Sequence, residues 1–266
     1  MSEAASRTWA NENAEVDIEV HNLSVGSGDG RVLLRDLNFE VSHGDVFIVM
    51  GPSGCGKSLL MRTFVGLQEP IAGDIFYDGQ NFTRADPEER RQIMSKLGVL
   101  FQSPAIFTSM TLAENVALPL SEFTDLSPPR IRELASLKLA LVGLRGFEGY
   151  YPNEISGGMQ KRAGLARAIA LDPHVLLADE PSAGLDPITS RLLDDLILEL
   201  SQSLGTTVVV VSHELPSIFS IGDDSILLDS EARTIVARGN PKELLAQSQD
   251  PRVQRFLRRG QWKRAA

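Results

Sequence analysis

Residues 51–58 read GPSGCGKS, and this short stretch decides the fold. It matches the pattern G-x-x-x-x-G-K-[ST] and follows an apolar run, DVFIVM at 45–50, that has the character of a buried strand. Gly51, Gly54 and Gly56 allow the backbone to curl so that successive N–H groups point at phosphate oxygens. The helical segment after the loop adds its positive N-terminal end to the same site. A chance glycine-rich turn is the alternative, but the strand before it and the helix after it favour a phosphate-binding loop.

The side chains at the end of this stretch supply the rest of the phosphate chemistry. Lys57 can reach the β- and γ-phosphates of a nucleotide, and the hydroxyl of Ser58 can ligate Mg²⁺. The predicted nucleotide-binding residues are therefore the whole loop and the residue after it: Gly51, Pro52, Ser53, Gly54, Cys55, Gly56, Lys57, Ser58 and Leu59.

A second stretch with catalytic potential, LLADEP at 176–181, ends an apolar run in two carboxylates. Ligands of open α/β sheets bind outside the carboxyl ends of the strands, which is where these acids emerge. Asp179 is the predicted Mg²⁺ ligand, directly or through water. Glu180 points the other way on the strand and is the predicted general base that polarises an attacking water. The alternative is that both acids only end the strand and cap the next segment of the chain.

Short β-branched runs alternate with helical stretches along the chain. This alternation predicts an α/β fold in which helices cover a parallel sheet. The predicted strands are DVFIVM (45–50), HVLLADE (174–180) and TTVVVVSHE (206–214). The predicted helices between them are 57–67, 156–171 and 187–203.

Two further parts of the chain depart from this alternation. Strand-like segments on either side of the phosphate-binding loop predict an antiparallel side sheet made from 15–25, 31–41 and 73–79. Residues 111–171 contain no convincing strand and predict a helical subdomain. Within it, DLSPPR at 125–130 opens a helix, with Ser127 able to cap it and the prolines able to start it.

The composition limits the function classes. The chain has 266 residues, 42% of them apolar, and no apolar run approaches the roughly 20 residues of a membrane span. The N-terminus shows no secretory signal, and the single cysteine, Cys55, fits a reducing cytosol. A net charge of −9 argues against a general nucleic-acid binder.

A second glycine-rich helix start, ISGGMQ at 155–160, needs its own explanation. Ser156 is a good N-cap, and Gly157 and Gly158 leave the next N–H groups unshielded, so this start resembles another anion site. It has no lysine and no metal-binding hydroxyl–aspartate pair, so it can grip a γ-phosphate but cannot hold a nucleotide alone. An ordinary capped helix, with glycine for close packing, is the alternative.

The order of motifs along residues 15–250 resembles the ATP-binding cassette (ABC) ATPases of ABC transporters. The motifs are the phosphate-binding loop, Gln102 in VLFQS, ISGGMQ, VLLADE, SAGLDP (182–187) and His213 in VVVSHE. The resemblance implies a P-loop NTPase with a RecA-like parallel-sheet core, an antiparallel β side sheet and a helical subdomain at about 111–171. Residues 251–266 would form a basic C-terminal extension. ISGGMQ would be the signature motif, which covers ATP held by another copy, so the chain would form a head-to-tail homodimer with two shared ATP sites.

The resemblance also assigns roles to single residues. Gln102 would sense Mg²⁺ and the transmembrane partner, Asp186 would link the two sites across the dimer interface, and His213 would contact the γ-phosphate from the strand end opposite Glu180. Taken alone, His213 could be a structural histidine and Gln102 a strand-terminal polar residue. Met159 stands where the family usually has Gln.

The family's adenine-stacking aromatic has no counterpart here. It normally lies in the loop after the first strand, but NLSVGSGDG at 22–30 offers only Val25 and no ring. This departure predicts loose selectivity for the base. ATP remains the predicted nucleotide because contacts to the triphosphate dominate such sites.

Three less distinctive stretches narrow the resemblance to the ATPases of MCE-associated, Mla-type lipid transporters: SPAIFTSMTLAENVALPLSEF (103–123), VGLRG (142–146) and DPRVQRFLRRG (250–260). The first is where family members dock the coupling helix of the membrane partner. The resemblance implies phospholipid movement between the inner and outer membranes of a Gram-negative bacterium, with the chain on the cytoplasmic face of the inner membrane. Its partners would be transmembrane permease subunits, a periplasmic MCE-domain lipid-binding protein and a small cytoplasmic STAS-type subunit, with no nucleic acid.

Other functions remain open from the sequence. The chain could serve another class of ABC transporter, or a non-transport membrane complex that regulates cell-wall enzymes. An ATP-driven switch on nucleic acid or ribosomes is disfavoured, because such relatives usually carry two cassettes or long coiled-coil insertions.

The basic tail allows three interpretations. Residues 251–266 carry six basic residues and no acid, and Val253, Phe256 and Leu257 fall on one helical face. The segment could be a solvated helix, a site of attraction for anionic lipid, or a helix whose apolar face packs on the neighbouring ATPase subunit. The third interpretation is the one predicted here.

Overall fold

The fold is built around a six-stranded sheet whose central strands are almost wholly apolar. The computed structural model describes residues 15–26, 30–103 and 105–259. In that part of the chain the strand order of this core sheet is β10-β9-β3-β8-β7-β6. The strands are β3 (Val46–Met50), β6 (Leu97–Leu100), β7 (Val175–Asp179), β8 (Thr207–Ser212), β9 (Asp224–Asp229) and β10 (Thr234–Arg238).

The core sheet confirms the predicted parallel arrangement. β3 pairs in parallel with β8 and β9, and β7 pairs in parallel with β6 and β8, while β10 runs antiparallel to β9 at the edge. Every residue of β3, β7 and β8 is buried, as expected for strands covered on both faces. β8 ends at Ser212, earlier than predicted, so His213 lies in the loop beyond the strand.

Alternate residues of each core strand enter two different hydrophobic cores. Val46, Ile48 and Met50 of β3 lie in a first core, shared with helices of the lower layer. Phe47 and Val49 lie in a second core, shared with the side sheet and with the helix after the phosphate-binding loop. This division follows from the period of two along a strand.

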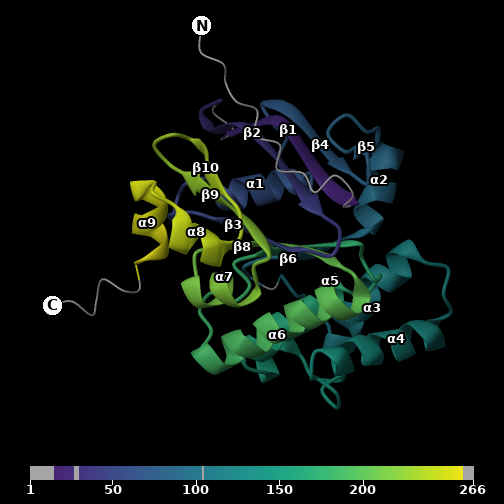
Figure 1. Cartoon of the computed structure of the whole chain (residues 1–266). Helices are drawn as coiled ribbons and strands as arrows, with labels where there is room; N and C mark the ends of the chain where they lie inside the picture. The colour runs from purple at the N-terminus through teal and green to yellow at the C-terminus, as the bar shows by residue number, and fades with distance from the viewer. Residues whose placement is uncertain (1–14, 27–29, 104, 260–266) are drawn as a thin grey trace, which may run out of the picture.

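A four-stranded antiparallel sheet covers the second core, as predicted. Among the described residues its order is β2-β1-β4-β5, from β1 (Val16–Gly26), β2 (Val32–Ser42), β4 (Ala72–Tyr77) and β5 (Gln80–Asn81). Helix α1 (Lys57–Phe64) lies between the two sheets, where Phe64 and Tyr77 are both buried (Figure 1). The hydroxyl of Tyr77 donates to the Phe64 carbonyl over 2.8 Å.

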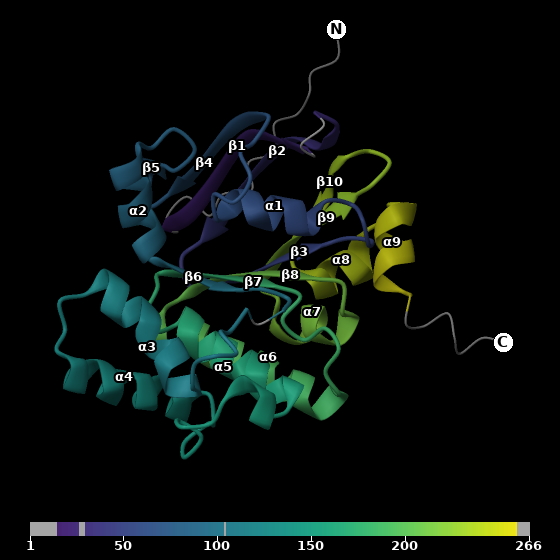
Figure 2. The same ribbon diagram turned by 180° about the vertical axis from the view of Figure 1, so that it is seen from behind.

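The first core is covered by helices, which Figure 2 shows as a layer on the opposite side from the side sheet. This layer includes the predicted helical region 111–171. It consists of α3 (Leu112–Phe123), α4 (Pro128–Leu141), η1 (Pro152–Glu154), α5 (Gly157–Ala168), α6 (Pro187–Leu204) and α7 (Leu215–Ile221). Helix α2 (Pro87–Ser95) leads into β6, and α8 (Pro241–Gln247) and α9 (Pro251–Leu257) end the described chain.

The starts of these helices show how far the capping predictions hold. α4 begins immediately after Ser127, as predicted, but within the described chain the Ser127 hydroxyl makes no cap hydrogen bond. α3 is capped more fully, because Thr111 and Glu114 form a reciprocal capping box.

Across the described ranges, no helix has the length and apolar character that a membrane span needs.

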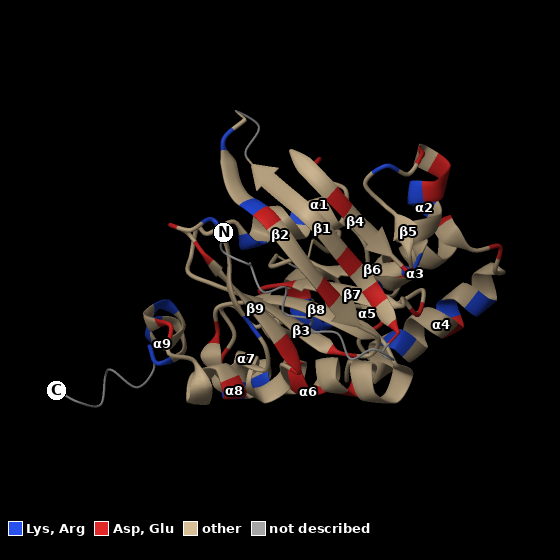
Figure 3. Cartoon of the chain, turned by 45° about the horizontal axis from the view of Figure 1, so that its top comes forward, with Lys and Arg blue, Asp and Glu red and all other residues tan. Residues whose placement is uncertain are grey.

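The C-terminal helix α9 corrects one prediction. Val253, Phe256 and Leu257 are buried in the first core of the same chain, so the prediction that this face packs on a neighbouring subunit is wrong. The arginines of this segment, coloured blue on the ribbon in Figure 3, are exposed: Arg252, Arg255, Arg258 and Arg259. The Arg259 guanidinium lies 4.1 Å from the centre of the Phe256 ring. Lys263 and Arg264 of the predicted basic segment lie outside the described residues.

Candidate active site

The phosphate-binding loop joins β3 to α1, and its glycines take up the backbone geometry that the sequence predicts. Gly54 and Gly56 have φ of 80° and 104°, in the left-handed region that favours glycine. Gly51 is needed for a different reason, because a Cβ there would lie 2.8 Å from the Leu228 carbonyl oxygen. Gly56 is the N-cap of α1 and has no side chain to cap it, so the first N–H groups of α1 face the loop.

Lys57 lies beneath this loop rather than in solvent. Its ammonium donates to the carbonyl oxygens of Gly51 at 2.9 Å and Pro52 at 3.1 Å, and only 6% of the residue is exposed. The same nitrogen is 4.0 Å from Oε1 of Glu180, the residue directly after β7. The positive charge is therefore held between the loop and the predicted general base.

Two oxygen atoms suited to Mg²⁺ meet where β7 ends. The Ser58 hydroxyl donates to Asp179 Oδ1 over 3.3 Å. Burial raises the pKa of the Asp179 carboxyl, an effect that the Ser58 hydrogen bond opposes. A hydroxyl and a carboxylate are hard ligands that fit Mg²⁺ when a nucleotide's phosphates and waters complete its octahedron. No group of three or more His, Cys, Asp or Glu side chains in the described residues is placed to hold a metal ion.

Glu180 and His213 meet because the strands that precede them, β7 and β8, are neighbours. His213 Nδ1 and Glu180 Oε1 are 2.7 Å apart. The other carboxylate oxygen, Oε2, is buried and has no hydrogen-bond partner among the described residues. A buried acceptor of this kind needs an explanation, and a water held for catalysis would supply the missing donor.

The backbone at Glu180 is also unusual. Its φ is 47°, which costs a residue other than glycine roughly 1 kcal/mol or more and persists only where the surroundings enforce it. The Glu180 amide donates to the Val211 carbonyl over 2.8 Å. Neither Asp179 nor Glu180 caps the next helix, because Asp186 has that role, so the alternative of a simple strand end with a cap does not describe these acids.

Two other predicted residues lie nearby but are not joined to this cluster. Gln102 follows β6, the edge strand beside β7, and is exposed. Asp186 is the N-cap of α6 and accepts hydrogen bonds from the amides of Ile188 and Thr189 and from the Thr189 hydroxyl. These bonds, led by the one from the Thr189 hydroxyl, hold the pKa of the Asp186 carboxyl below its ordinary value.

The second glycine-rich start belongs to α5 and is built differently. Ser156 is its N-cap, as predicted, and accepts a hydrogen bond from the Met159 amide over 3.3 Å. Ser156 and Gly157 are exposed, and no heavy atom of the described chain would lie within 4 Å of a Cβ on Gly157. A Cβ on Gly158 would lie 2.5 Å from Thr189 Cγ2, so the close-packing explanation applies to Gly158 but not to Gly157.

The two glycine-rich starts do not form one pocket within a chain. Helix α1 packs in the second core through Leu60 and Phe64, and α5 packs in the first core through Ala163 and Leu165. The core sheet separates these two cores. Figure 2 shows α1 and α5 on opposite sides of it.

The structure describes only part of the loop that lacks the adenine-stacking aromatic. Val25 lies in β1 and is completely buried in the second core, so it offers no surface to a base. Residues 27–29 of the predicted loop lie outside the described residues.

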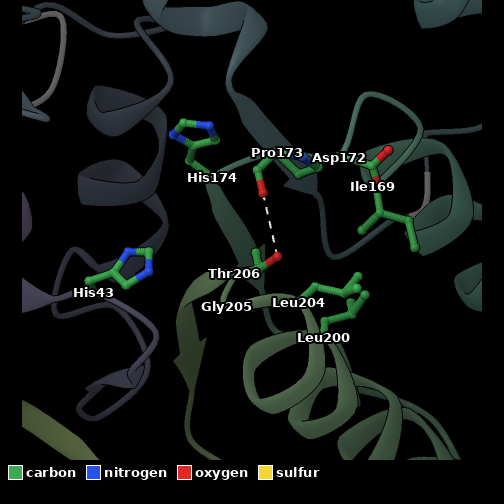
Figure 4. Close-up of a pocket in the computed structure, with 9 residues that line it drawn as sticks. All are labelled: His43, Ile169, Asp172, Pro173, His174, Leu200, Leu204, Gly205 and Thr206. Carbon is green, nitrogen blue, oxygen red and sulfur yellow. Dashed lines mark hydrogen bonds between the residues drawn. The ribbon is translucent and has the colours of Figure 1, made fainter.

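A hollow of about 380 Å³ lies at the edge of the core sheet where β7 and β8 begin, opposite the candidate active site (Figure 4). It is lined by residues that come just before β7 and β8, including Pro173, His174 and Thr206, with His43 at its far side. The Thr206 hydroxyl donates to the Pro173 carbonyl over 3.5 Å. Asp179, Glu180 and His213 lie at the opposite ends of the same strands, so this hollow is separate from the candidate active site.

Sequence reasoning missed one residue close to the site, Lys161 on α5. Only 8% of Lys161 is exposed, and its ammonium donates to the carbonyls of Pro181 and Ala183, directly after Glu180. A lysine in a helix normally faces solvent, and backbone carbonyls leave no trace in the sequence. No pattern in the chain could have revealed this contact.

Comparisons with known proteins agree with this geometry. Residues 34–183 match the family model described as ABC transporter. The intermembrane phospholipid transport system ATP-binding protein MlaF of Haemophilus influenzae is 42% identical over 241 residues, which is 91% of this chain and 90% of that protein. The probable ribonucleotide transport ATP-binding protein mkl of Mycobacterium tuberculosis is 40% identical over 242 residues, covering 91% of this chain and 66% of that protein.

The fold also matches a solved structure closely. The dimeric post-hydrolysis state of the ATP-binding cassette MJ0796, bound to ADP and Pi, superposes with a TM-score of 0.76 at 29% identity. The match covers 84% of this chain and 98% of that chain.

Proposed function

The chain belongs to the ABC transporter family, and from that premise we propose that it is an ATP-hydrolysing subunit that drives phospholipid transport between two membranes. The observation that carries the ATPase assignment is the buried Glu180 carboxylate, with Oε1 on His213 and Oε2 without a partner in the described chain. It lies beside Lys57 and the Ser58–Asp179 pair.

Each of these residues has a distinct task in the hydrolysis. The N–H groups of the loop and of the first turn of α1 bind the phosphates, and Lys57 neutralises charge on the β- and γ-phosphates. Ser58 and Asp179 would hold Mg²⁺, which supplies further positive charge to the phosphoryl oxygens. Glu180 Oε2 takes a proton from water as the water oxygen bonds to the γ-phosphorus and the bond to the bridging oxygen of ADP breaks. His213 holds the carboxylate by its other oxygen.

The complete site requires a second copy of the chain. The exposed start of α5 has an N-cap serine and an open Gly157, and it lies across the core sheet from the chain's own phosphate-binding loop. A second copy placed head to tail would bring its α5 start onto the γ-phosphate. The dimeric state of MJ0796 bound to ADP and Pi supports this arrangement.

A groove of about 320 Å³ supports docking of a membrane permease. Its walls come from β6 and from the ends of α2, α3 and α5. They include the charged residues Glu122 and Arg167 and the apolar residues Met94, Leu97, Leu118, Pro119 and Phe123. Met94 and Phe123 are 43% and 45% exposed, so this wall offers apolar surface to a partner. We place the permease's coupling helix here, at the end of the predicted docking segment 103–123, of which residue 104 lies outside the described residues.

The cargo and the remaining partners are inferred from the relatives. MlaF is named for intermembrane phospholipid transport, which makes phospholipid the proposed cargo. The MCE-domain and STAS-type partners and the place at the cytoplasmic face of the inner membrane are part of the same proposal. A role in regulating cell-wall enzymes is not favoured by these relatives.

The test of the ATPase assignment is the variant Glu180→Gln. Losing the general base should slow hydrolysis by roughly 10²- to 10⁴-fold while ATP still binds, and ATP should then hold the variant as a dimer. Phosphate release, nucleotide binding and light scattering measure the three properties. Glu199→Gln on α6, a glutamate that lines a separate surface groove, is the matched control and should hydrolyse normally.

A wild-type rate in Glu180→Gln would overturn the assignment of the base. The cargo needs a separate experiment, in which the complex is purified from membranes and its bound molecules are extracted. Recovery of phospholipid supports the proposal, whereas recovery of ribonucleotide at the permease would favour the function named for mkl.

A further inference from the structure

Lys161 is a buried lysine on α5, and the proposed mechanism gives it no task. It lies one helical turn beyond Gly157 and is 8% exposed. Burial lowers the pKa of its ammonium, and the nearby carboxylates of Glu180 and Glu214 oppose that shift. A buried ammonium is costly unless its donors are satisfied, so its hydrogen-bond partners must offset the loss of water.

Those partners are two carbonyl oxygens of one turn. Lys161 Nζ donates to the carbonyl of Pro181 at 2.8 Å and to that of Ala183 at 2.5 Å. Within the same turn the Ala183 amide donates to the Glu180 carbonyl over 3.2 Å. One ammonium therefore clamps the backbone immediately after Glu180.

The clamp acts where the backbone needs support. Glu180 is held at a φ of 47°, although the proline after it favours an extended backbone at Glu180. Strain of this kind remains only when neighbouring contacts fix the segment. The Lys161 hydrogen bonds are contacts of that kind, and they come from a different layer of the fold.

The same helix also contacts the far end of this loop. The first turn of α5 approaches Thr189 so closely that a Cβ on Gly158 would lie 2.5 Å from Thr189 Cγ2. The Thr189 hydroxyl in turn donates to Asp186 over 2.5 Å. Helix α5 thus contacts the turn after Glu180 and also Thr189, which is hydrogen-bonded to Asp186 at the other end of the same segment.

We propose that Lys161 is a positioning residue that couples the start of α5 to the Glu180 turn of the same chain. This inference rests on the proposed function, in which the α5 start binds the nucleotide of one shared site while Glu180 acts in the other. Contact of Ser156 and Gly157 with a γ-phosphate shifts α5, and Lys161 carries that shift to the Pro181 and Ala183 carbonyls. Glu180 is aligned for catalysis only when the opposite site is engaged.

The test uses the full chain with Lys161→Met, which removes the donors and keeps the length of the side chain. Misplacing Glu180 should lower kcat by roughly 10- to 100-fold and leave the Kd for ATP unchanged. The Hill coefficient for ATP in hydrolysis should fall to 1. Lys161→Arg, which can still donate to both carbonyls, should recover most of the rate and the cooperativity.

The neighbouring residue provides a matched control. Arg162 also lies on α5 and also donates to two backbone carbonyls, those of Val142 at 3.0 Å and Gly143 at 3.3 Å, but these belong to the helical subdomain. Arg162→Met should lower the Tm about as much as Lys161→Met does. It should leave kcat and the Hill coefficient near those of the wild type.

A double-mutant cycle separates positioning from a general structural role. If Lys161 acts through Glu180, adding Lys161→Met to Glu180→Gln should change the residual rate by no more than about 2-fold. An additive loss, an unchanged kcat, or a wild-type Hill coefficient in Lys161→Met would overturn the inference. If Lys161→Met does not fold, Lys161→Gln is measured against the same criteria. Loss of hydrolysis in the wild type itself, or full activity in Glu180→Gln, would instead overturn the proposed function.

Discussion

Two helices of this chain, α1 and α5, begin in glycine-rich turns, and their surroundings differ in almost every respect. The turn before α1 encloses the buried Lys57, and the next residue, Ser58, donates a hydrogen bond from its hydroxyl to Asp179 at the end of β7. The turn before α5 has a serine cap and an exposed Gly157 with open space around it. The first turn is equipped to hold a nucleotide within one chain, whereas the second has only N–H groups to offer.

These differences in surroundings indicate which task each glycine-rich turn performs. A site that must hold a whole nucleotide needs a fixed charge, a metal ligand and a base, and here those groups lie at the ends of β3 and β7, two strands of one sheet. A site that only completes another chain's pocket needs access, so its glycine must stay uncovered. The same local motif therefore serves two purposes, which are distinguished by the residues around it.

The largest expected effect comes from removing the lysine of the first turn. Lys57→Ala should weaken ATP binding by roughly 100-fold or more, because it deletes the charge that the loop encloses, and hydrolysis should fall to background. Calorimetry or a fluorescent nucleotide measures the Kd. Lys96→Ala, which removes an exposed ammonium 3.6 Å from Asp78, should bind ATP normally. Tight ATP binding in Lys57→Ala would show that the first turn is not the nucleotide site.

The next effect tests the open turn. Gly157→Glu places a carboxylate where the partner's γ-phosphate is proposed to lie, so hydrolysis should fall roughly 100-fold while the isolated chain still binds ATP. Stability should not suffer, because the side chain enters open space and an acid at a helix N-terminus is favourable. Gly157→Gln, of equal size and no charge, should lose less activity. Equal activity in Gly157→Glu and wild type would remove α5 from the site.

A smaller effect should separate the two glycines of the second turn. Gly158→Ala should lower the free energy of unfolding by about 1–3 kcal/mol, because its Cβ meets Thr189 Cγ2 at 2.5 Å. Thr189→Ser removes that methyl group, keeps the hydroxyl that bonds Asp186, and should rescue the variant. Gly157→Ala should leave unfolding unchanged in the same denaturant titration. Equal losses at both glycines would contradict the distinction drawn here.

The smallest effect concerns the caps. Hydrogen bonds from Thr189 and Ile188 hold the pKa of Asp186 below its ordinary value of 3.8. A carboxyl with a depressed pKa stabilises the fold above its unfolded pKa and loses that contribution as pH falls through the folded pKa. The Tm of Asp186→Asn should therefore lie slightly below wild type at pH 7, and the gap should close in more acidic buffers. Ser156→Asn, at the uncharged cap of α5, should show a gap that does not change with pH.

Much of the fold could be predicted because its signals are local. The phosphate-binding loop, the buried strands around Asp179 and the cap at Ser156 each follow from a few adjacent residues. The relation between Glu180 and His213 was less accessible, since it depends on β7 and β8 lying side by side in the sheet. The sequence predicts that Glu180 polarises the attacking water, and the family resemblance implies that His213 contacts the γ-phosphate. Their direct hydrogen bond follows only from the topology.

The sequence could not reveal two features because each depends on which partner a residue meets in the fold. Lys161 binds backbone carbonyls, which every residue carries, so nothing in the sequence distinguishes Pro181 and Ala183 as its acceptors. The face of Val253, Phe256 and Leu257 was predicted to be covered, and it is. The pattern could not say which chain covers it, and the prediction of a neighbouring subunit was wrong.

The burial of α9 has a practical consequence for anyone who shortens this protein. A stop codon at residue 250 would strip Val253, Phe256 and Leu257 from the interior, and poor expression would then be mistaken for a transport defect. Charge reversal at Arg255 and Arg258, with the apolar residues untouched, is the safer way to ask what the basic end of the chain recognises. A reporter that replaces the chain from Pro251 onward would remove the same three buried side chains as the truncation.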